Sequence, residues 1–305
     1  MSTATFKAAV IRTPGGPDSI EFIDLPVAGP GPGEVRVQIV AAPVNPVDLT
    51  VASGPLHAMG LINQPDHTGL GWDFAGTVAA VGPGVDLAAG TRVAGLVDGF
   101  DRDFGTYAEQ LIVPATSLAV VPDRLDLAAA STVPLNALTA AQIVDLLGDA
   151  PTDGSRLLVT GAAGAVGGYT ASLAQDRGWQ VTGLARAEDE DFVRSLGAGF
   201  TTNAEPGWDA VADGAVMQEQ ALALVRDGGA FVGVQPSAKL PAERGIRVDA
   251  VIVHPDGPRL AGLLARAASG ELPARVHAVV PLDQVADAQR AVAKGGVRGR
   301  YVLRP

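Results

Sequence analysis

The sequence predicts an α/β fold in which a compact, mostly antiparallel β barrel is followed by a doubly wound parallel sheet. Two observations carry this prediction. In the first third, short valine-rich segments alternate with glycine- and proline-rich turns such as 29–33 and 82–84, which is typical of an antiparallel barrel. From Leu127 onward, helical runs alternate with short apolar strands, which is typical of a doubly wound α/β domain.

Each expected element is an apolar or helix-favouring run that ends at turn residues. In the first part of the chain the expected strands are 6–11, 19–24, 34–41, 73–81, 92–96 and 108–113. Two helices, 127–132 and 137–147, lead into the expected parallel strands 157–160, 180–184, 209–212, 230–234 and 248–254. Helices over 259–269 and 282–294 and a closing strand over 300–303 complete the prediction.

Composition narrows the function classes. The chain has 305 residues, of which 47% are hydrophobic and 18% charged, so it can bury the cores of two ordinary domains. A formal net charge of −11 disfavours non-specific binding to nucleic acid or to an anionic membrane surface. The absence of cysteine excludes disulfides, thiolate nucleophiles and cysteine–zinc sites. Without a signal-like N-terminus or a membrane-length apolar run, we expect a soluble, cytoplasmic protein.

The segment 157–168 (LLVTGAAGAVGG) is the most informative motif. Three apolar residues predict a buried strand, a glycine-rich turn follows, and a helical run begins by Tyr169. This arrangement places backbone N–H groups and the positive end of a helix dipole at one point, which suits a pyrophosphate. A second strand at 180–184 lies at βαβ distance and strengthens the prediction of a dinucleotide site. The expected phosphate-binding residues are Gly161, Ala163, Gly164, Ala165 and Val166.

The end of the second strand favours NADP(H) over NAD(H). NAD-binding folds usually place an acidic residue there for the adenosine ribose, whereas this chain has Ala185 followed by Arg186. A small residue leaves room for a 2′-phosphate, and a guanidinium pairs with it bidentately. Four acidic residues at 188–191 lower the local potential, so a solvated Arg186 is the alternative.

Several motifs occur in one order along nearly the whole chain. They are 45–48 (NPVD), 71–78 (GWDFAGTV), 105–109 (GTYAE), 138–140 (LTA), the glycine loop, 195–198 (SLGA) and 299–303 (GRYVL). In these motifs the chain resembles the medium-chain dehydrogenase/reductase superfamily, specifically its zinc-free quinone oxidoreductase-like branch. The resemblance implies a Rossmann NADP-binding domain (124–256) inserted in a mostly β, GroES-like catalytic domain (1–123 and 257–305), with the active site between them.

The resemblance also implies that a metal is absent. The positions that match the catalytic zinc ligands of zinc-dependent relatives are Asn45, Trp72 and Leu135, none of which is a plausible zinc ligand. His57 and His67 lie in one loop-like segment without an obvious third ligand. We therefore expect no metal site and no alcohol oxidation, whereas hydride donation to an electron-poor acceptor stays feasible.

Five further residues are candidates for contact with the cofactor or the substrate. By resemblance Asn45 lies beside the nicotinamide, where it can donate a hydrogen bond to a substrate carbonyl; the alternative is a turn residue before Pro46. By resemblance Thr139 contacts the cofactor near its nicotinamide end; the alternative is an ordinary helix-face threonine. Gly233 and Val234 end a strand, where α/β sheets bind ligands, and by resemblance their backbone would hold the carboxamide. Arg300 is a further cofactor-binding candidate whose alternative is a solvated strand-end residue.

A proton donor is harder to find. Tyr107 and His57 are the only nearby candidates, and a packing or surface role is favoured for each. Asp48 is expected to be structural, bonding its own loop.

These observations predict an NADPH-dependent, metal-independent reductase that transfers a hydride to quinones or α,β-unsaturated carbonyl compounds. Two alternatives stay open: an enoyl reductase acting on carrier-bound polyketide chains, and a non-catalytic NADPH-binding sensor. We also expect a homodimer, because residues 248–253 form a long apolar strand at the edge of the parallel sheet.

Overall fold

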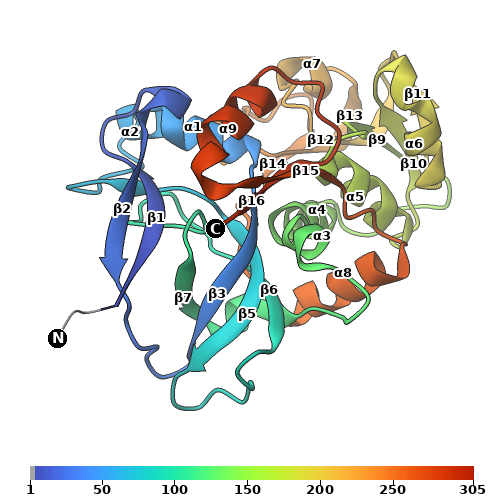
Figure 1. Cartoon of the computed structure of the whole chain (residues 1–305). Coiled ribbons are helices and arrows are strands. Elements are labelled where there is room, and N and C mark those ends of the chain that lie inside the picture. Colours follow the sequence, from blue (N-terminus) through green and yellow to red (C-terminus); the bar gives the residue numbers. More distant parts are fainter. Residues whose placement is uncertain (1–3) are drawn as a thin grey trace. The chain divides into compact units, whose positions relative to one another are not determined.

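The chain passes from a β-rich unit into a parallel α/β unit at residue 136 and returns at residue 255. The computed structural model describes residues 4–305 (Figure 1). The first unit consists of the residues up to 135 together with 255–305, and the second of residues 136–254. The sequence placed these boundaries at 123/124 and 256/257. The first differs because α3 (Leu127–Ser131) packs on strands of the β-rich unit.

Two sheets build the β-rich unit. The smaller one is antiparallel and has the order β2 (Ile20–Pro26), β1 (Thr5–Ile11), β4 (Thr68–Gly69). The seven-stranded sheet has the order β15 (Val276–Pro281), β16 (Arg300–Arg304), β3 (Glu34–Pro43), β5 (Asp73–Val81), β6 (Arg92–Leu96), β8 (Leu118–Val120), with β7 (Gln110–Pro114) also paired to β3. Only the β15–β16 pair of this sheet is parallel.

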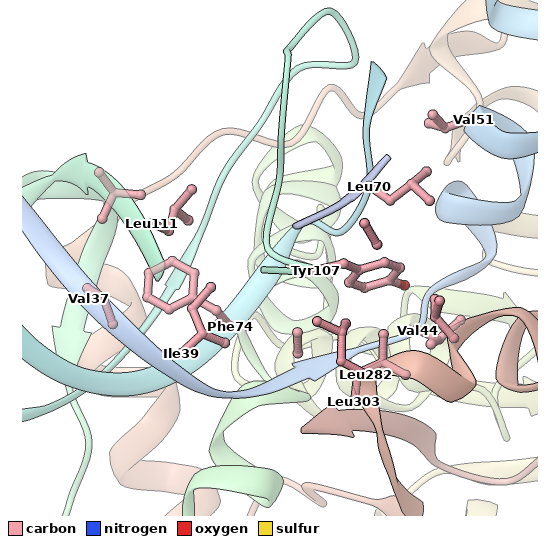
Figure 2. Packing of buried hydrophobic residues seen from close by; sticks show 14 of the residues in the cluster. Val37, Ile39, Val44, Val51, Leu70, Phe74, Tyr107, Leu111, Leu282 and Leu303 are labelled. Atoms are coloured by element: carbon pink, nitrogen blue, oxygen red, sulfur yellow. The ribbon is translucent and has the colours of Figure 1, made fainter. Parts of the chain in front are cut away.

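The C-terminal segment belongs to the first unit, as the resemblance implied. β16 pairs with β3 in antiparallel register, with Val302 opposite Pro43 and Leu303 opposite Ala42. Leu282 and Leu303 from this segment join the same buried cluster as Val44 (Figure 2). The predicted fold class, a Rossmann domain inserted in a GroES-like barrel domain, is confirmed.

Short helices and turns complete the β-rich unit. The helices are α1 (Pro46–Ser53), α2 (Pro55–Ala58), α3, α8 (Gly257–Ser269) and α9 (Val285–Ala293), and the 3-10 turns are Gly16–Ser19, Ala115–Ser117 and Leu282–Gln284. The core of the unit includes Val37, Ile39, Phe74 and Leu111, which lie together in Figure 2.

The α/β unit contains one six-stranded parallel sheet. Its order is β11 (Gly199–Thr201), β10 (Gln180–Leu184), β9 (Arg156–Thr160), β12 (Trp208–Asp213), β13 (Val225–Gly233), β14 (Arg247–Ala250). Its helices are α4 (Pro134–Leu147, of which residues 136–147 belong to this unit), α5 (Ala165–Gln175), α6 (Glu190–Ser195) and α7 (Glu219–Leu222); 3-10 turns occur at Ala187–Asp189 and Pro236–Ala238.

The last strand is shorter than the sequence predicted. The expected strand over 248–254 ends at Ala250. Val251 N still donates to the Gly233 carbonyl at 2.9 Å, but at the end of the expected strand the side chain of Gln142 in α4 binds the backbone of His254 twice, donating to its carbonyl at 2.8 Å and accepting from its N–H at 3.1 Å. That backbone is therefore not available for a ladder. No helix within residues 4–305 is long and apolar enough to cross a membrane.

Candidate functional site

The glycine loop joins β9 to α5 and has the geometry of a phosphate-binding turn. Gly161 has φ +62°, a conformation that L side chains rarely adopt. Gly164 is the residue before α5, and within the described chain no side chain caps this helix end. The first N–H groups of a helix lack intrahelical partners, so this uncapped end suits an anionic group.

Gly167 brings α5 against the end of β9. A Cβ built at this position would lie 2.3 Å from the carbonyl oxygen of Gly161 and 2.7 Å from its carbonyl carbon. Real Cβ contacts are never so short, so only glycine permits this approach of helix to strand. The close packing fixes the position of the loop, as expected of the last glycine in a dinucleotide-binding motif.

A buried carboxylate, which the sequence analysis did not single out, orders the neighbouring loop. Asp213 ends β12 and accepts from the Thr160 hydroxyl at 2.6 Å, from Met217 N at 3.1 Å and from Gln218 N at 2.8 Å. Ala215 N donates to Thr160 at 3.1 Å, and a Cβ on Gly161 would lie 3.2 Å from Ala215. The only sequence signal was an acidic residue at the end of an apolar strand.

The predicted cofactor residues of this unit share one edge of the sheet. Because β9, β10 and β13 are parallel, the glycine loop, Ala185–Arg186 and Gly233–Val234 all follow strand carboxyl ends. Thr139 lies in α4 and is largely buried. The structure thus brings the loop and the two strand ends to the edge where doubly wound sheets bind ligands.

Arg186 is exposed but not isolated. Its Nε lies 3.2 Å from Glu188 Oε1 and 3.8 Å from Asp189 Oδ2. Both carboxylates belong to the acidic run that the sequence showed. A 2′-phosphate at this position would have to replace them as the partner of the guanidinium.

In the β-rich unit, the Asn-Pro-Val-Asp motif forms the start of α1. Asn45 is the N-cap, and Asp48 accepts from Asn45 N at 2.9 Å, from Gly71 N at 3.0 Å and from the Tyr107 hydroxyl at 2.8 Å. Burial raises the pKa of Asp48 to about 6, although these hydrogen bonds oppose the shift. Asp48 therefore ties α1 to the Gly71 segment and to Tyr107, the structural role that the sequence predicted.

The side chain of Asn45 is fully buried and already bonded. Its Nδ2 donates to Asp73 Oδ1 at 2.8 Å, and its Oδ1 accepts from Arg300 Nε at 2.9 Å. The structure therefore unites two predicted site residues, Asn45 and Arg300. Their contacts with cofactor or substrate remain predictions.

Asp73 is the central acid of this network, and the sequence analysis did not weigh it as a site residue. It is fully buried and also accepts from Leu135 N at 3.1 Å. Burial is the main cause that raises the pKa of Asp73 to about 8; the nearby Asp48 adds to the shift, whereas Arg300 and the hydrogen bonds oppose it. Asp73 thus links two positions, Asn45 and Leu135, that match zinc ligands in zinc-dependent relatives.

The two proton-donor candidates differ in environment. Tyr107 is fully buried, and both burial and the bond to Asp48 raise the pKa of its hydroxyl well above the usual value. His57 Nε2 lies 3.2 Å from the Thr68 hydroxyl, and partial burial lowers its pKa against the opposing effect of Asp101. Tyr107 therefore has the surroundings of the packing residue that the sequence favoured.

Trp72 is almost fully buried and contacts an aromatic ring, Phe100, and a guanidinium, Arg102. Its ring contacts Phe100 edge-on at a centroid distance of 5.2 Å, and the Arg102 guanidinium lies 4.9 Å from its centroid. Residues 4–305 contain no group of three or more His, Cys, Asp or Glu side chains that could hold a metal ion.

Two family models match the chain. Residues 31–123 match the alcohol dehydrogenase GroES-like domain, and residues 186–303 match a model described as zinc-binding dehydrogenase.

Similar sequences come from bacteria, plants and a fungus. The chain is 34% identical over 233 residues to pikromycin polyketide synthase component PikAII of Streptomyces venezuelae, which covers 70% of this chain and 6% of the synthase. It is 30% identical over 290 residues to the chloroplastic NADPH-dependent alkenal/one oxidoreductase of Arabidopsis thaliana, covering 89% of this chain and 72% of that protein. The chain spans between 4% and 56% of the length of PikAII and three other matches.

Among solved structures, the quinone oxidoreductase from Coxiella burnetii superposes with a TM-score of 0.83. The two chains are 23% identical, and the match covers 99% of this chain and all of that chain. This likeness shows a shared fold.

Proposed function

The chain belongs to the medium-chain dehydrogenase/reductase superfamily, and on that premise we propose that it is an NADPH-dependent reductase of quinones or α,β-unsaturated carbonyl compounds that works without a metal. The observation that carries the proposal is the close approach of Gly167 to Gly161, which supports a phosphate-binding role for the turn at the carboxyl edge of the parallel sheet. The names of the Arabidopsis and Coxiella proteins support the acceptor class.

A nicotinamide cofactor fits the residues of the α/β unit. The uncapped end of α5 and the loop 161–166 would hold the pyrophosphate, while the backbone of Gly233 and Val234 would hold the carboxamide. Thr139, Asn45 and Arg300 are the proposed further contacts of the cofactor. When bound, the nicotinamide supplies the hydride, and the protein supplies position and exclusion of water.

We assign the preference for NADPH to Arg186. Ala185 leaves room beside the adenosine ribose, and Arg186 would exchange Glu188 and Asp189 for the 2′-phosphate. The test compares the dissociation constants of NADPH and NADH for the wild type and Arg186→Ala. We expect NADPH to bind about tenfold more weakly to the variant and NADH to be unaffected.

Arg194→Ala is the matched control for that test. Arg194 is as exposed as Arg186, at 56%, and likewise pairs with a carboxylate, Glu190 at 2.7 Å. Equal weakening by both substitutions would mean a general charge effect and would remove Arg186 from the site.

Asn45 is the group that we propose to face the oxyanion of the reduced acceptor. Its Nδ2 donates to Asp73 and, at 3.5 Å, to the Pro43 carbonyl, and its Oδ1 accepts from Arg300. The N–H on Pro43 would have to exchange this long contact for the oxyanion, while Asp73 and Arg300 keep the amide oriented. The buried phenol of Tyr107 is engaged by Asp48, so solvent is the proposed source of the proton.

The acceptor class is tested by NADPH oxidation with benzoquinone, phenanthrenequinone and a panel of enones. Turnover of any of these with NADPH, and much slower turnover with NADH, is the expected result. Tight NADPH binding without turnover of any acceptor would overturn the reductase and favour the non-catalytic sensor.

The likeness to a polyketide synthase favours one second candidate, reduction of an enoyl thioester. Acyl carrier proteins are themselves acidic, and a net charge of −11 opposes their docking. A comparison of an enoyl pantetheine thioester with the same chain on a carrier protein separates the candidates. Faster reduction of the carrier-bound form would favour the second.

We also propose a homodimer joined at β14. This strand lies at an edge of the six-stranded sheet, where unpaired backbone groups invite pairing with a second copy. A dimer mass by light scattering at micromolar concentration is the expected result, and a monomer mass would refute the proposal.

A further inference from the structure

A cavity of about 280 Å³ in the β-rich unit shares no residue with the network around Asp73. Its wall is largely apolar and includes Phe6 of β1 and Leu25 of β2. The rings of Phe6 and Phe104 meet edge to face at a centroid distance of 5.6 Å. Edge-to-face contact is a favoured arrangement of aromatic rings, so these two rings offer a surface on which a further flat ring can pack.

Two residues of the cavity wall each carry a buried polar atom without a hydrogen-bond partner among residues 4–305: Arg36 Nε, a donor, and Gln110 Oε1, an acceptor. In the β3–β7 ladder Arg36 is opposite Ile112, so Gln110 lies on the same face, one diagonal step away. The Arg36 guanidinium is held in place because its Nη1 donates to the Ala28 carbonyl at 2.9 Å.

An unpaired buried donor beside an unpaired buried acceptor destabilises a protein unless something satisfies both. No residue around Arg36 Nε and Gln110 Oε1 forms a hydrogen bond with either atom, and Arg36 forms no ion pair within the described chain. A ligand group that both accepts and donates would fit the pair.

We propose that this cavity is a binding site for a small neutral phenol. Its ring would pack against Phe6 and Phe104, and its hydroxyl would accept from Arg36 Nε and donate to Gln110 Oε1. A hydroxyl is both donor and acceptor, whereas a carboxylate only accepts. The exposed carboxylate of Asp103 in the cavity wall also disfavours an anion.

The size of the cavity agrees with one substituted ring. An apolar cavity of about 150 Å³ already holds benzene. The present cavity, at about 280 Å³, is smaller than most sites for drug-sized ligands. The proposal concerns binding only, and its test does not depend on the proposed reductase activity.

The test is a titration of the 305-residue chain with phenol, without nicotinamide cofactor, monitored by NMR chemical shifts and by calorimetry. Gln110→Leu removes the acceptor, and Ala28→Phe fills the cavity from an exposed position in its wall. We expect Gln110→Leu to weaken binding about three- to tenfold, and Ala28→Phe to abolish it.

Gln38→Leu is the matched control, because Gln38 lies opposite Gln110 in the ladder but is exposed and outside the cavity wall. It is expected to bind phenol as the wild type does. Benzoate is the second probe and is expected to bind more weakly than phenol. No phenol binding, or equal binding by wild type and Ala28→Phe, would overturn the site. Tighter binding of benzoate would overturn its assignment to a phenol.

Discussion

Asn45 Nδ2 lies 2.8 Å from Asp73 Oδ1, so a fully buried carboxyl group orients the amide that begins α1. The same carboxyl accepts from Leu135 N, and the same amide accepts from Arg300. Four segments of the β-rich unit therefore meet at one acid. Removing its proton leaves a charge where burial disfavours one, which makes the network sensitive to pH.

Stability is expected to fall as the pH rises toward 8. Burial raises the pKa of Asp73 from 3.8 to about 8, so the folded state holds a proton that the unfolded state loses near pH 4. The free energy of unfolding then declines with rising pH between these values and is level outside them. Between pH 6 and 8 we expect a loss of about 1–3 kcal/mol, measured by urea unfolding.

Asp73→Asn isolates this effect, because the raised pKa of Asp48, about 6, acts mainly at lower pH. The variant is expected to be less stable than the wild type at pH 6, because its amide N–H₂ faces one of the two donors, Asn45 Nδ2 or Leu135 N. Between pH 6 and 8 its free energy of unfolding should then change little. Asp24→Asn, at an exposed position, should keep the slope of the wild type. An unchanged slope in Asp73→Asn would show that the carboxyl is already ionised at pH 6.

Local patterns predicted much of the fold. The expected strand over 180–184 matches β10, and the glycine loop lies between β9 and α5 as predicted. These elements depend on apolar runs and turn residues close in sequence. Helix α1 was missed because its β-branched, mixed sequence lacks a helical period; the Asn45–Asp48 cap and burial of Val51 and Ala52 stabilise it instead.

The network around Asp73 was not predictable from local sequence. Its partners Asn45 and Leu135 are 28 and 62 residues away along the chain, and Arg300 approaches Asn45 across 255 residues. Only the pairing of β16 with β3 brings Arg300 there. The position of Asp73 directly after Gly71-Trp72 does not indicate which distant residues it contacts. The sequence could therefore point to Asn45 and Arg300, but not to the acid that joins them.

Tyr107→Phe is expected to lower stability and to spare catalysis. The substitution removes the hydroxyl that donates to Asp48 Oδ2 at 2.8 Å and leaves a buried acceptor with one donor fewer. We expect a loss of about 1–3 kcal/mol in urea unfolding and a kcat within about twofold of the wild type. Tyr301→Phe is the control, since the Tyr301 hydroxyl forms no hydrogen bond within residues 4–305 and its removal should change the stability little. A fall in kcat of about a hundredfold in Tyr107→Phe would instead assign proton donation to this phenol.

Glu188→Gln is expected to strengthen NADPH binding if Arg186 binds the 2′-phosphate. Glu188 Oε1 lies 3.2 Å from Arg186 Nε and competes for it. Because exposed ion pairs contribute at most about 1 kcal/mol, the KM for NADPH should fall by about two- to fivefold, with the KM for NADH unchanged. Glu190→Gln is the control, because it removes a charge from the same acidic run, but Glu190 pairs with Arg194 and not with Arg186. It should leave the KM for NADPH and the KM for NADH nearly unchanged. A KM for NADPH that falls equally in both variants would indicate only a change in local potential.

Gly167→Ala is expected to displace the glycine loop. The new Cβ would meet the Gly161 carbonyl at 2.3 Å, and because backbone cannot rotate away, α5 must shift from β9. Such overpacking destabilises by about 1–3 kcal/mol, and NADPH should bind at least about tenfold more weakly by fluorescence titration. Gly168→Ala is one residue further along the same helix, where a Cβ has only ordinary contacts, with Ala162 O at 3.4 Å as the nearest. Because alanine favours a helix over glycine, this control should keep NADPH affinity and gain about 0.5–1 kcal/mol of stability. If Gly167→Ala bound NADPH as tightly as Gly168→Ala, the phosphate site would not depend on the approach of α5 to the end of β9.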